Sequence, residues 1–210
     1  KESSAASDVY KRQVMQPYEF ERIRKILYKL KQYRVRHQQP VAPLFLKRET
    51  WVPYEQGTYF GEKNAYYQLQ GSIQVPADWV ENLCVLQVYS SLSEWDNTTN
   101  PQIKIYLDDT YVQAIDVNHR EITLTKQFLQ KVVNLKIDLF SGRSDKPFPL
   151  QVNLLALDPA VNDIWYDFYT LFDSWRAIRA FGGDEAFYQQ VLGQVANVLD
   201  FRTPLLNGIL

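Results

Sequence analysis

The residues best suited to chemistry lie in one short polar segment of this chain. It contains Asp116, Asn118, His119, Arg120 and Glu121, and His119 is one of only two histidines. Such a loop could reach the rim of another domain's active site or hydrogen-bond a sugar hydroxyl. The alternative is a bend in which the Asp and Asn side chains satisfy their own backbone. We favour the bend, because a lone histidine without a nearby Ser, Cys or second metal ligand makes no catalytic set.

Other segments of the sequence offer no catalytic, cofactor or metal motif. The chain has no cysteine pair, no histidine pair at helical spacing and no acidic calcium loop. The single Cys84 stands in an apolar strand pattern and is expected to be buried and inert. His37 follows a basic stretch and is expected to be a cation at a helix end. We therefore predict no catalytic, cofactor-binding or metal-binding residue in this chain.

Aromatic side chains are a stronger signal, since they make up 14% of the residues. They cluster at Trp51, Tyr54, Tyr59, Phe60, Tyr66 and Tyr67, with Trp79 and Trp95 beside the next strand. An exposed row of such rings would suit carbohydrate binding, because sugars present apolar C–H faces that pack on them. The alternative, which we favour, is that the rings fill the protein core, because aromatic residues are common in strands.

The composition is that of an ordinary globular protein, with 46% apolar and 22% charged residues. A net charge of -1 argues against nucleic acid as a partner, since nucleic-acid-binding proteins are strongly basic. No apolar run is long enough to span a membrane. One cysteine excludes a disulfide framework and permits a reducing compartment.

From residue 44 to residue 157 the sequence has the two-residue period of β-strands. Strands are predicted at Glu49–Tyr54, Tyr66–Val75, Leu83–Tyr89, Val132–Phe140 and Pro149–Leu157, with a β-meander over Ile103–Leu124. The segment Leu83–Tyr89 is apolar on both faces at its start and is expected to be central. About eight strands joined by short polar turns predict a mostly β fold, an antiparallel jelly-roll-like sandwich of the galactose-binding-like kind.

Helices are predicted on both sides of this sandwich. An apolar stripe at Phe20, Ile23, Leu27 and Leu30 follows Pro17 and indicates a first helix. Pro40 and Pro43 are expected to end it. A second helix carries Ile164, Phe168, Leu171, Trp175 and Ile178 at helical spacing, and a third follows Asp184 as its cap. The second helix is apolar on most sides, which predicts burial between two partners.

Changes in composition divide the chain into four parts. Residues 3–13 correspond codon by codon to a sequencing adapter, so residues 1–13 are expected to be an artefact. An N-terminal helix and linker are predicted at 14–43, the sandwich at 44–157 and a helical connector at 158–210. The connector ends in an apolar tail and is expected to lead to a missing catalytic domain.

The segment Ile103–Leu124 has a distinctive order of elements: an apolar strand, the turn Asp108-Asp109, a second strand, the polar loop and a third strand. In this order it resembles the amino-terminal β-domain of family 38 glycoside hydrolases, the α-mannosidases of bacterial and cytosolic type. The resemblance runs from Phe20 to the end of the chain. The family has Asp-Gly at the turn. This chain has Asp109 in place of the glycine, which weakens a tight primed turn without removing it.

The resemblance implies a parent enzyme that hydrolyses terminal α-mannosides with retention, using a carboxylate nucleophile and a divalent cation, normally zinc. The family's metal site begins with Gly-His-x-His-x-Asp, which this chain lacks, so those ligands would follow Leu210. The chain itself would be an inactive, non-catalytic part that packs on its own catalytic domain and helps to form a homo-oligomer. A mannoside or oligosaccharide substrate and a bacterial cytoplasmic location follow from the same resemblance.

Two alternatives remain open at this point. The chain could be a free-standing carbohydrate-binding module with accessory helices, which predicts a soluble monomer that binds a mannoside. It could also be a structural interaction domain with no link to sugars. An exposed apolar surface along the helix Trp165–Trp175 would favour the truncated enzyme.

Overall fold

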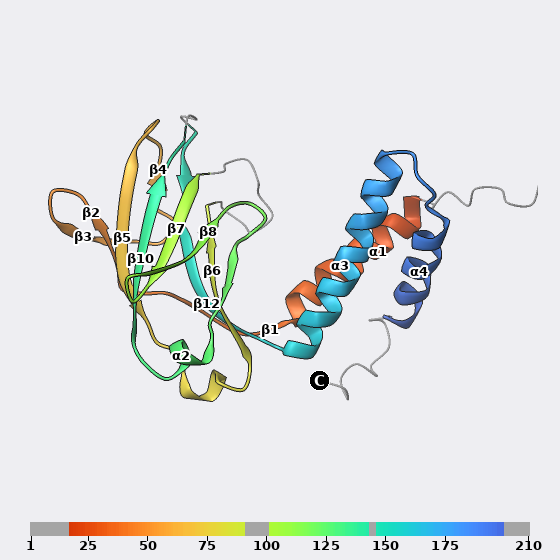
Figure 1. The fold of residues 1–210 in the computed structure, drawn as a ribbon, viewed down its shortest axis with the longest axis horizontal. Helices are drawn as coiled ribbons and strands as arrows, with labels where there is room; N and C mark the ends of the chain where they lie inside the picture. Colours follow the sequence, from red (N-terminus) through yellow and green to blue (C-terminus); the bar gives the residue numbers. More distant parts are fainter. Residues whose placement is uncertain (1–16, 91–100, 143–145, 200–210) are drawn as a thin grey trace, which may run out of the picture. The chain divides into compact units, whose positions relative to one another are not determined.

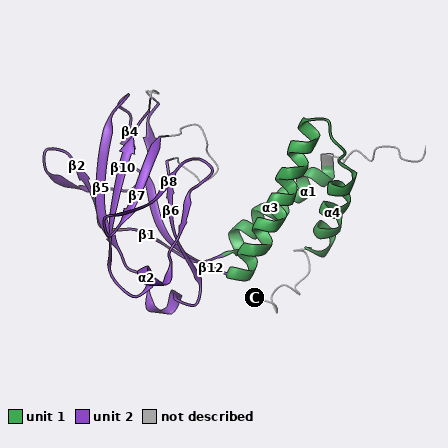
Figure 2. Cartoon of the chain, in the orientation of Figure 1, with its two compact units in different colours: residues 1–34, 159–210 green, residues 35–158 purple. Residues whose placement is uncertain are grey.

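The computed structural model describes residues 17–90, 101–142 and 146–199, which form two compact units (Figures 1 and 2). The helical unit consists of the described residues of 1–34 and 159–210, and the β-unit of those of 35–158. The predicted adapter segment, Trp95 and the apolar tail lie outside the described residues.

The described strands of the β-unit pair into two main sheets and one short pair. The four-stranded sheet has the order β1 (Val35–Pro40), β12 (Gln151–Leu157), β6 (Leu83–Tyr89) and β9 (Glu121–Thr123). The six-stranded sheet has the order β3 (Trp51–Tyr54), β2 (Leu44–Lys47), β5 (Tyr66–Ile73), β10 (Val133–Phe140), β7 (Gln102–Leu107) and β8 (Thr110–Ile115). The short pair is β4 (Tyr59–Phe60) with β11 (Phe148–Pro149). A 3-10 turn at Ala77–Trp79 and the short helix α2 (Lys126–Leu129) lie in the connections.

The core of the β-unit lies between the two main sheets. Leu86 and Leu154 from the four-stranded sheet join Leu69 and Ile137 from the six-stranded sheet in one cluster of buried side chains. All pairings between strands are antiparallel in the described residues. The prediction of a mostly β antiparallel sandwich with an N-terminal helix and a C-terminal helical pair is therefore confirmed.

Strand β10 lies in the middle of the six-stranded sheet, between β5 and β7. Its residues alternate between buried and more accessible positions along the whole strand, as expected for a sheet with one face on the core. Leu135, Ile137 and Leu139 point into the core. The residues between them therefore project from the outer face of this sheet.

The predicted meander over Ile103–Leu124 is wrong at its third strand. Strands β7 and β8 form an antiparallel hairpin, but β9 pairs with β6 in the four-stranded sheet. Ile115 and Ile122 are both buried, so the polar segment between them carries the chain from one sheet to the other. A pattern of alternating residues gives the face of a strand but not its neighbour, which is why the sequence did not reveal the crossover.

The first helix ends earlier than predicted, and a strand follows it. Helix α1 spans Pro17–Tyr33, and the basic residues after it belong to β1, at the edge of the four-stranded sheet. Arg36 forms an ion pair with the mostly buried Asp158. His37 is not a helix-end cation, because its ring stacks on Trp79 with the centroids 5.3 Å apart.

The helical unit contains α1, α3 (Pro159–Ala180) and α4 (Ala186–Val198) (Figure 2). Their shared core includes Ile23 and Leu27 of α1, Phe168 and Trp175 of α3, and Leu192 of α4. The third predicted helix begins one residue after the expected position, with Glu185 as its cap. Asp184 nevertheless accepts a hydrogen bond from the backbone N–H of Ala186 at 3.0 Å.

Helix α3 is less completely buried than its sequence predicted. Trp165 and Trp175 are buried, and the indole N–H of Trp165 donates to the carbonyl of Leu27. Tyr166 and Tyr169 instead remain exposed. No helix among the described residues has the length and apolar character needed to cross a membrane.

One charged residue lies inside the helical unit. Arg34 is 2% exposed, and its Nη1 donates to Oδ1 of Asn162 at 2.9 Å. Its guanidinium lies 4.8 Å from the ring centroid of Trp165. A buried charge of this kind is stabilised only while its donors keep their acceptors.

Replacing Asn162 should test this contact. We expect Asn162→Leu to lower the free energy of unfolding by about 1–3 kcal/mol, because it removes an acceptor from a buried guanidinium. Asn162→Asp is the matched control, since it keeps an oxygen at the same position. Urea denaturation followed by circular dichroism measures both, and equal stability of the two variants would contradict the argument.

The turn between β7 and β8 consists of Asp108 and Asp109, with φ angles of 47° and 63°. Positive φ at both central residues is the geometry of a primed hairpin turn, so the predicted turn is confirmed. Asp108 accepts hydrogen bonds from Lys131 Nζ at 2.6 Å and from the backbone N–H of Asn134 at 2.9 Å. The contact with Lys131, followed by that with Asn134, lowers the pKa of Asp108.

The left-handed conformation of Asp109 leads to a stability prediction. Asp109→Gly should raise the free energy of unfolding by about 0.5 kcal/mol, because glycine adopts this conformation without a Cβ clash. Asp109→Val should lower it by about 1–2 kcal/mol. Chemical denaturation gives both values, and a valine variant as stable as the glycine variant would rule out strain at this turn.

Candidate functional site

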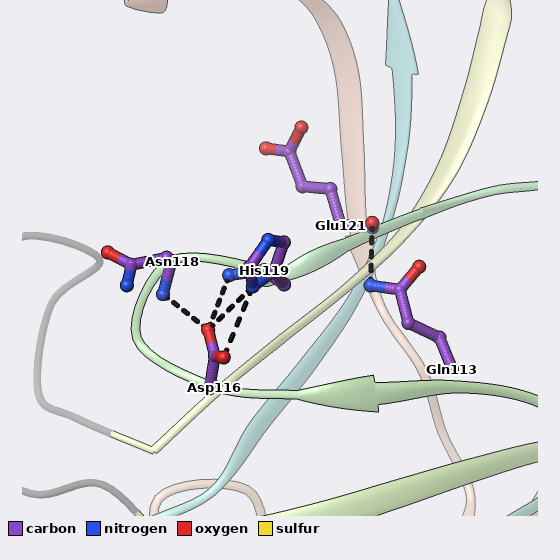
Figure 3. Close-up of polar contacts among 5 residues, drawn as sticks. All are labelled: Gln113, Asp116, Asn118, His119 and Glu121. Carbon is purple, nitrogen blue, oxygen red and sulfur yellow. Dashed lines mark hydrogen bonds and ion pairs between the residues drawn. The ribbon is translucent and has the colours of Figure 1, made fainter. Parts of the chain in front are cut away.

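The predicted polar loop is organised around the carboxylate of Asp116 (Figure 3). Its Oδ1 accepts hydrogen bonds from the backbone N–H groups of Asn118 and His119 at 2.7 and 2.8 Å. Nδ1 of His119 lies 3.0 Å from the same oxygen. These contacts stabilise the bend through its own side chains and backbone, as expected if its polar side chains satisfy their own backbone.

The carboxyl group of Asp116 is held in its charged form. Partial burial acts to raise its pKa, but the hydrogen bonds from Asn118 and His119 together outweigh that effect, so the pKa is lowered. The side chains of Asp116 and His119 are 45% and 70% exposed, so solvent screens this contact.

The other residues of the predicted set point elsewhere. The carbonyl of Arg120 accepts the N–H of Val88 at 2.8 Å, which ties the loop to β6. The carboxylate of Glu121 accepts a hydrogen bond from Nε2 of Gln87 at 3.2 Å. In Figure 3 the Glu121 side chain points away from Asp116, while Gln113 donates to the Glu121 carbonyl. Asp116, Asn118 and His119 therefore contact one another while the Glu121 side chain points away, and a role at an active-site rim stays a prediction.

The described residues offer little else for nucleophilic or metal chemistry. Cys84 is 1% exposed, as predicted, and burial raises the pKa of its thiol. A buried thiol with a raised pKa is a poor nucleophile. Within residues 17–90, 101–142 and 146–199, no three His, Cys, Asp or Glu side chains come together in a way that could hold a metal ion.

A different set of side chains meets on the outer face of the six-stranded sheet. The strand registers place Gln70, Lys136 and Tyr106 in one row across β5, β10 and β7. The next row contains Gln68, Asp138 and Lys104, and the third contains Tyr66, Phe140 and Gln102. Cross-strand neighbours of this kind lie about 5 Å apart, so each row is a continuous strip.

Direct contacts hold the middle of this face in place. Nε2 of Gln68 donates to Oδ1 of Asp138 at 2.9 Å, and Nζ of Lys136 lies 3.7 Å from Oδ2 of the same carboxylate. Lys136 Nζ also lies 4.8 Å from the ring centroid of Tyr106. The amide, carboxylate and ammonium groups are therefore fixed relative to one another while they remain open to solvent.

Two hollows lie on this face and share Gln68. The first has a volume of about 450 Å³. Its lining includes the rings of Phe45 and Trp51, and the polar groups of Gln70, Ser72 and Asn134. It therefore combines apolar ring surface with hydrogen-bonding groups, which is the composition of a small-ligand site.

The second hollow has a volume of about 690 Å³. The rings of Tyr66 and Phe140 line it with their centroids 4.6 Å apart, and Tyr66 is 81% exposed. Lys47, Lys104 and Asp138 supply charged groups beside these rings. The outer face thus presents an exposed pair of rings next to fixed polar side chains.

The residues of the predicted aromatic cluster divide between the core and the outer face. Tyr54 and Phe60 are buried, and burial raises the pKa of Tyr54 to about 12 despite its hydrogen bond to Leu150. Tyr66 and Trp51 instead line the hollows. The polar residues on the outer face of β5 and β10 were missed in the sequence. The signal was present, because these outward positions alternate with the apolar positions from which the two strands were predicted.

Comparison with known proteins gives a likeness of fold only. No family model and no curated protein matches the chain. Similar solved structures include a β-glucuronidase from Ruminococcus gnavus with D-glucaro-d-lactam, at 9% identity and a TM-score of 0.41, over 59% of this chain and 30% of that one. A second structure, also of a β-glucuronidase from Ruminococcus gnavus, matches at 9% identity and a TM-score of 0.39, over 59% of this chain and 29% of that one. A third structure, of a β-glucuronidase from Ruminococcus gnavus with D-glucaro 1,5-lactone, matches at 10% identity and a TM-score of 0.39, over 59% of this chain and 30% of that one.

The predicted membership in family 38 is wrong. The solved structures similar to this chain include β-glucuronidases, which are glycoside hydrolases but not α-mannosidases, and no family model matches. The resemblance depended on reading Ile103–Leu124 as one meander, whereas its third strand belongs to the other sheet. The expected mannoside specificity depended on that resemblance and is withdrawn with it. The matched part spans less than a third of each β-glucuronidase.

The loop around Asp116 leads to a prediction about pH. A carboxyl group with a lowered pKa in the folded state stabilises that state above its unfolded pKa of about 3.9, and this effect is lost as the pH falls through the folded value. Asp116→Asn keeps an oxygen acceptor but removes the charge. The wild type should therefore be more stable than this variant at pH 7, and the difference should shrink below about pH 4. Unfolding curves between pH 7 and 3 measure it, and a constant difference would contradict the assignment.

Proposed function

We propose that the β-unit is a non-catalytic carbohydrate-binding domain, with its binding site on the outer face of the six-stranded sheet. One observation carries the proposal: two hollows that share Gln68 bring exposed rings and fixed hydrogen-bonding side chains together on one face. Sugars present both apolar C–H faces and hydroxyl groups. A surface that offers rings and amides side by side matches both.

The arrangement favours an oligosaccharide over a single sugar. The rows from Tyr66 to Ser72 extend over seven residues of β5, and the six steps between them correspond to about 20 Å along the strand. Trp51 and Phe45 line the first hollow and Tyr66 and Phe140 the second, so ring surface is available at both. A chain of several sugar units could contact both sets of rings at once.

The sheet also supports binding by limiting motion. Gln68, Lys136 and Asp138 lie on strands with continuous backbone pairing, and their side chains contact one another. Groups held in place before binding lose less conformational entropy when a ligand arrives. We further propose that the whole protein is a glycoside hydrolase in which this domain keeps the polymer close and so raises its local concentration.

Replacing residues of the outer face should test the proposed function. The full chain should bind at least one glycan in a panel of neutral and acidic polysaccharides. Tyr66→Ala and Gln68→Ala should each weaken that binding by about tenfold, which corresponds to about 1.4 kcal/mol. Isothermal titration calorimetry gives the affinities, and thermal unfolding checks that both variants fold.

Tyr59→Ala is the matched control for the ring. Tyr59 is also an exposed tyrosine, at 53%, and it lies on β4 and lines neither hollow. Its replacement should leave the affinity unchanged. Failure to bind any glycan, or equal binding by the Tyr66 and Tyr59 variants, would refute the proposed function.

A further inference from the structure

The two hollows of the outer face differ in charge. The first has one acidic and one basic side chain in its lining, Asp109 and Lys136, which balance. The second has three basic side chains and one acidic one, namely Lys47, Arg48, Lys104 and Asp138. The excess of positive charge in the second hollow contrasts with the net charge of -1 of the whole chain.

The single carboxylate of the second hollow is already engaged. Asp138 accepts a hydrogen bond from Gln68 and lies 3.7 Å from the ammonium of Lys136, which belongs to the first hollow. Lys136 therefore competes with the basic side chains of the second hollow for this carboxylate, and three basic side chains against one acidic one leave the second hollow with an excess of positive charge.

The basic side chains of this hollow are not equivalent. Burial, followed by the charge of Glu62, raises the pKa of Tyr67, and the positive charge of Arg48 opposes this shift. Lys47 has its Nζ 5.3 Å from the ring centroid of Trp51, a contact that keeps the positive charge. Lys104 is exposed and forms no ion pair with any residue that the structure describes. Lys47 and Lys104 are therefore the cations most available to a ligand.

Lys104 lies near the ring pair of Tyr66 and Phe140 on the sheet. Lys104 lies opposite Asp138, two residues along the sheet from the row that contains Tyr66 and Phe140. Two residues of a strand span about 7 Å. A flexible lysine side chain can therefore reach the substituent of a sugar ring that packs on Tyr66.

We propose that the glycan bound on this face is anionic, with carboxylate or sulfate groups that contact Lys104 and Lys47 while its rings pack on Tyr66 and Phe140. This inference rests on the proposed function and specifies its ligand class. Because the lysines are exposed, each contact is weak and screened by salt. Selectivity for an acidic glycan then comes from several such contacts acting together.

Polygalacturonate and its methyl ester provide a direct test, since they share a backbone and differ in charge. The full chain should bind polygalacturonate about tenfold more tightly than the ester at low salt. Lys104→Gln and Lys47→Gln should each weaken this binding by about threefold. Added salt should reduce the affinity for the acidic polymer. Affinity electrophoresis and calorimetry measure all of these effects.

Lys126→Gln is the matched control, because Lys126 is an exposed lysine of α2 that lines neither hollow. It should bind like the wild type, and an equal loss in this variant would overturn the inference by showing unspecific attraction. Binding of dextran sulfate without polygalacturonate would support the inference and identify sulfate as the anion.

The remaining outcomes separate the two proposals. Equal binding of polygalacturonate and its ester would overturn the inference and leave the proposed function in place. Binding of no glycan would overturn both. Tighter binding of a single-stranded oligonucleotide than of any glycan would also overturn both, because it would make nucleic acid the ligand.

Discussion

The strict two-residue alternation of β10 is the constraint on which the candidate site depends. Leu135, Ile137 and Leu139 must face the core, because burial of such side chains is the main stabilising term of the sandwich. Lys136 and Asp138 are thereby fixed on the opposite face. A shift of one residue in register would exchange the two sets, bury two charges and expose the core. The packing of the core therefore determines the position of the site.

The buried face and the outer face of the six-stranded sheet are consequently linked by strand register, because one register determines which residues lie on each face. Strands β5 and β7 keep their own apolar residues inside, so Gln68 and Lys104 are brought beside Asp138. Each of β5, β10 and β7 supplies one residue to each row, and the pairing of the strands brings these residues together. The ring pair of Tyr66 and Phe140 arises in the same way, since these two residues are directly opposite each other. Most of this surface is built from strand residues, and the connections add only a few lining residues such as Arg48 and Asp109.

The sequence predicted the class of fold correctly because that class follows from periodicity alone. It also predicted the buried Cys84 and the turn at Asp108 and Asp109, which depend on local patterns. It did not predict that β9 leaves its hairpin for the other sheet, since strand order is not a local property. It also did not predict β1, because basic residues such as Arg36 and His37 are equally compatible with the end of a helix and with an edge strand.

The same distinction explains why the sequence did not reveal the side chains of the sheet face. The polar segment around His119 was conspicuous because its polar residues are consecutive. The carboxylate of Asp116, however, accepts hydrogen bonds from the backbone of this same segment, which connects the two sheets. The residues of the sheet face are spread over five strands and lie between apolar neighbours in each. A binding surface on a sheet is dispersed in the sequence by the two-residue period itself. For a sandwich of this kind, side chains that meet on one face of a sheet are therefore found from the outward positions of neighbouring strands, and not from a contiguous polar motif.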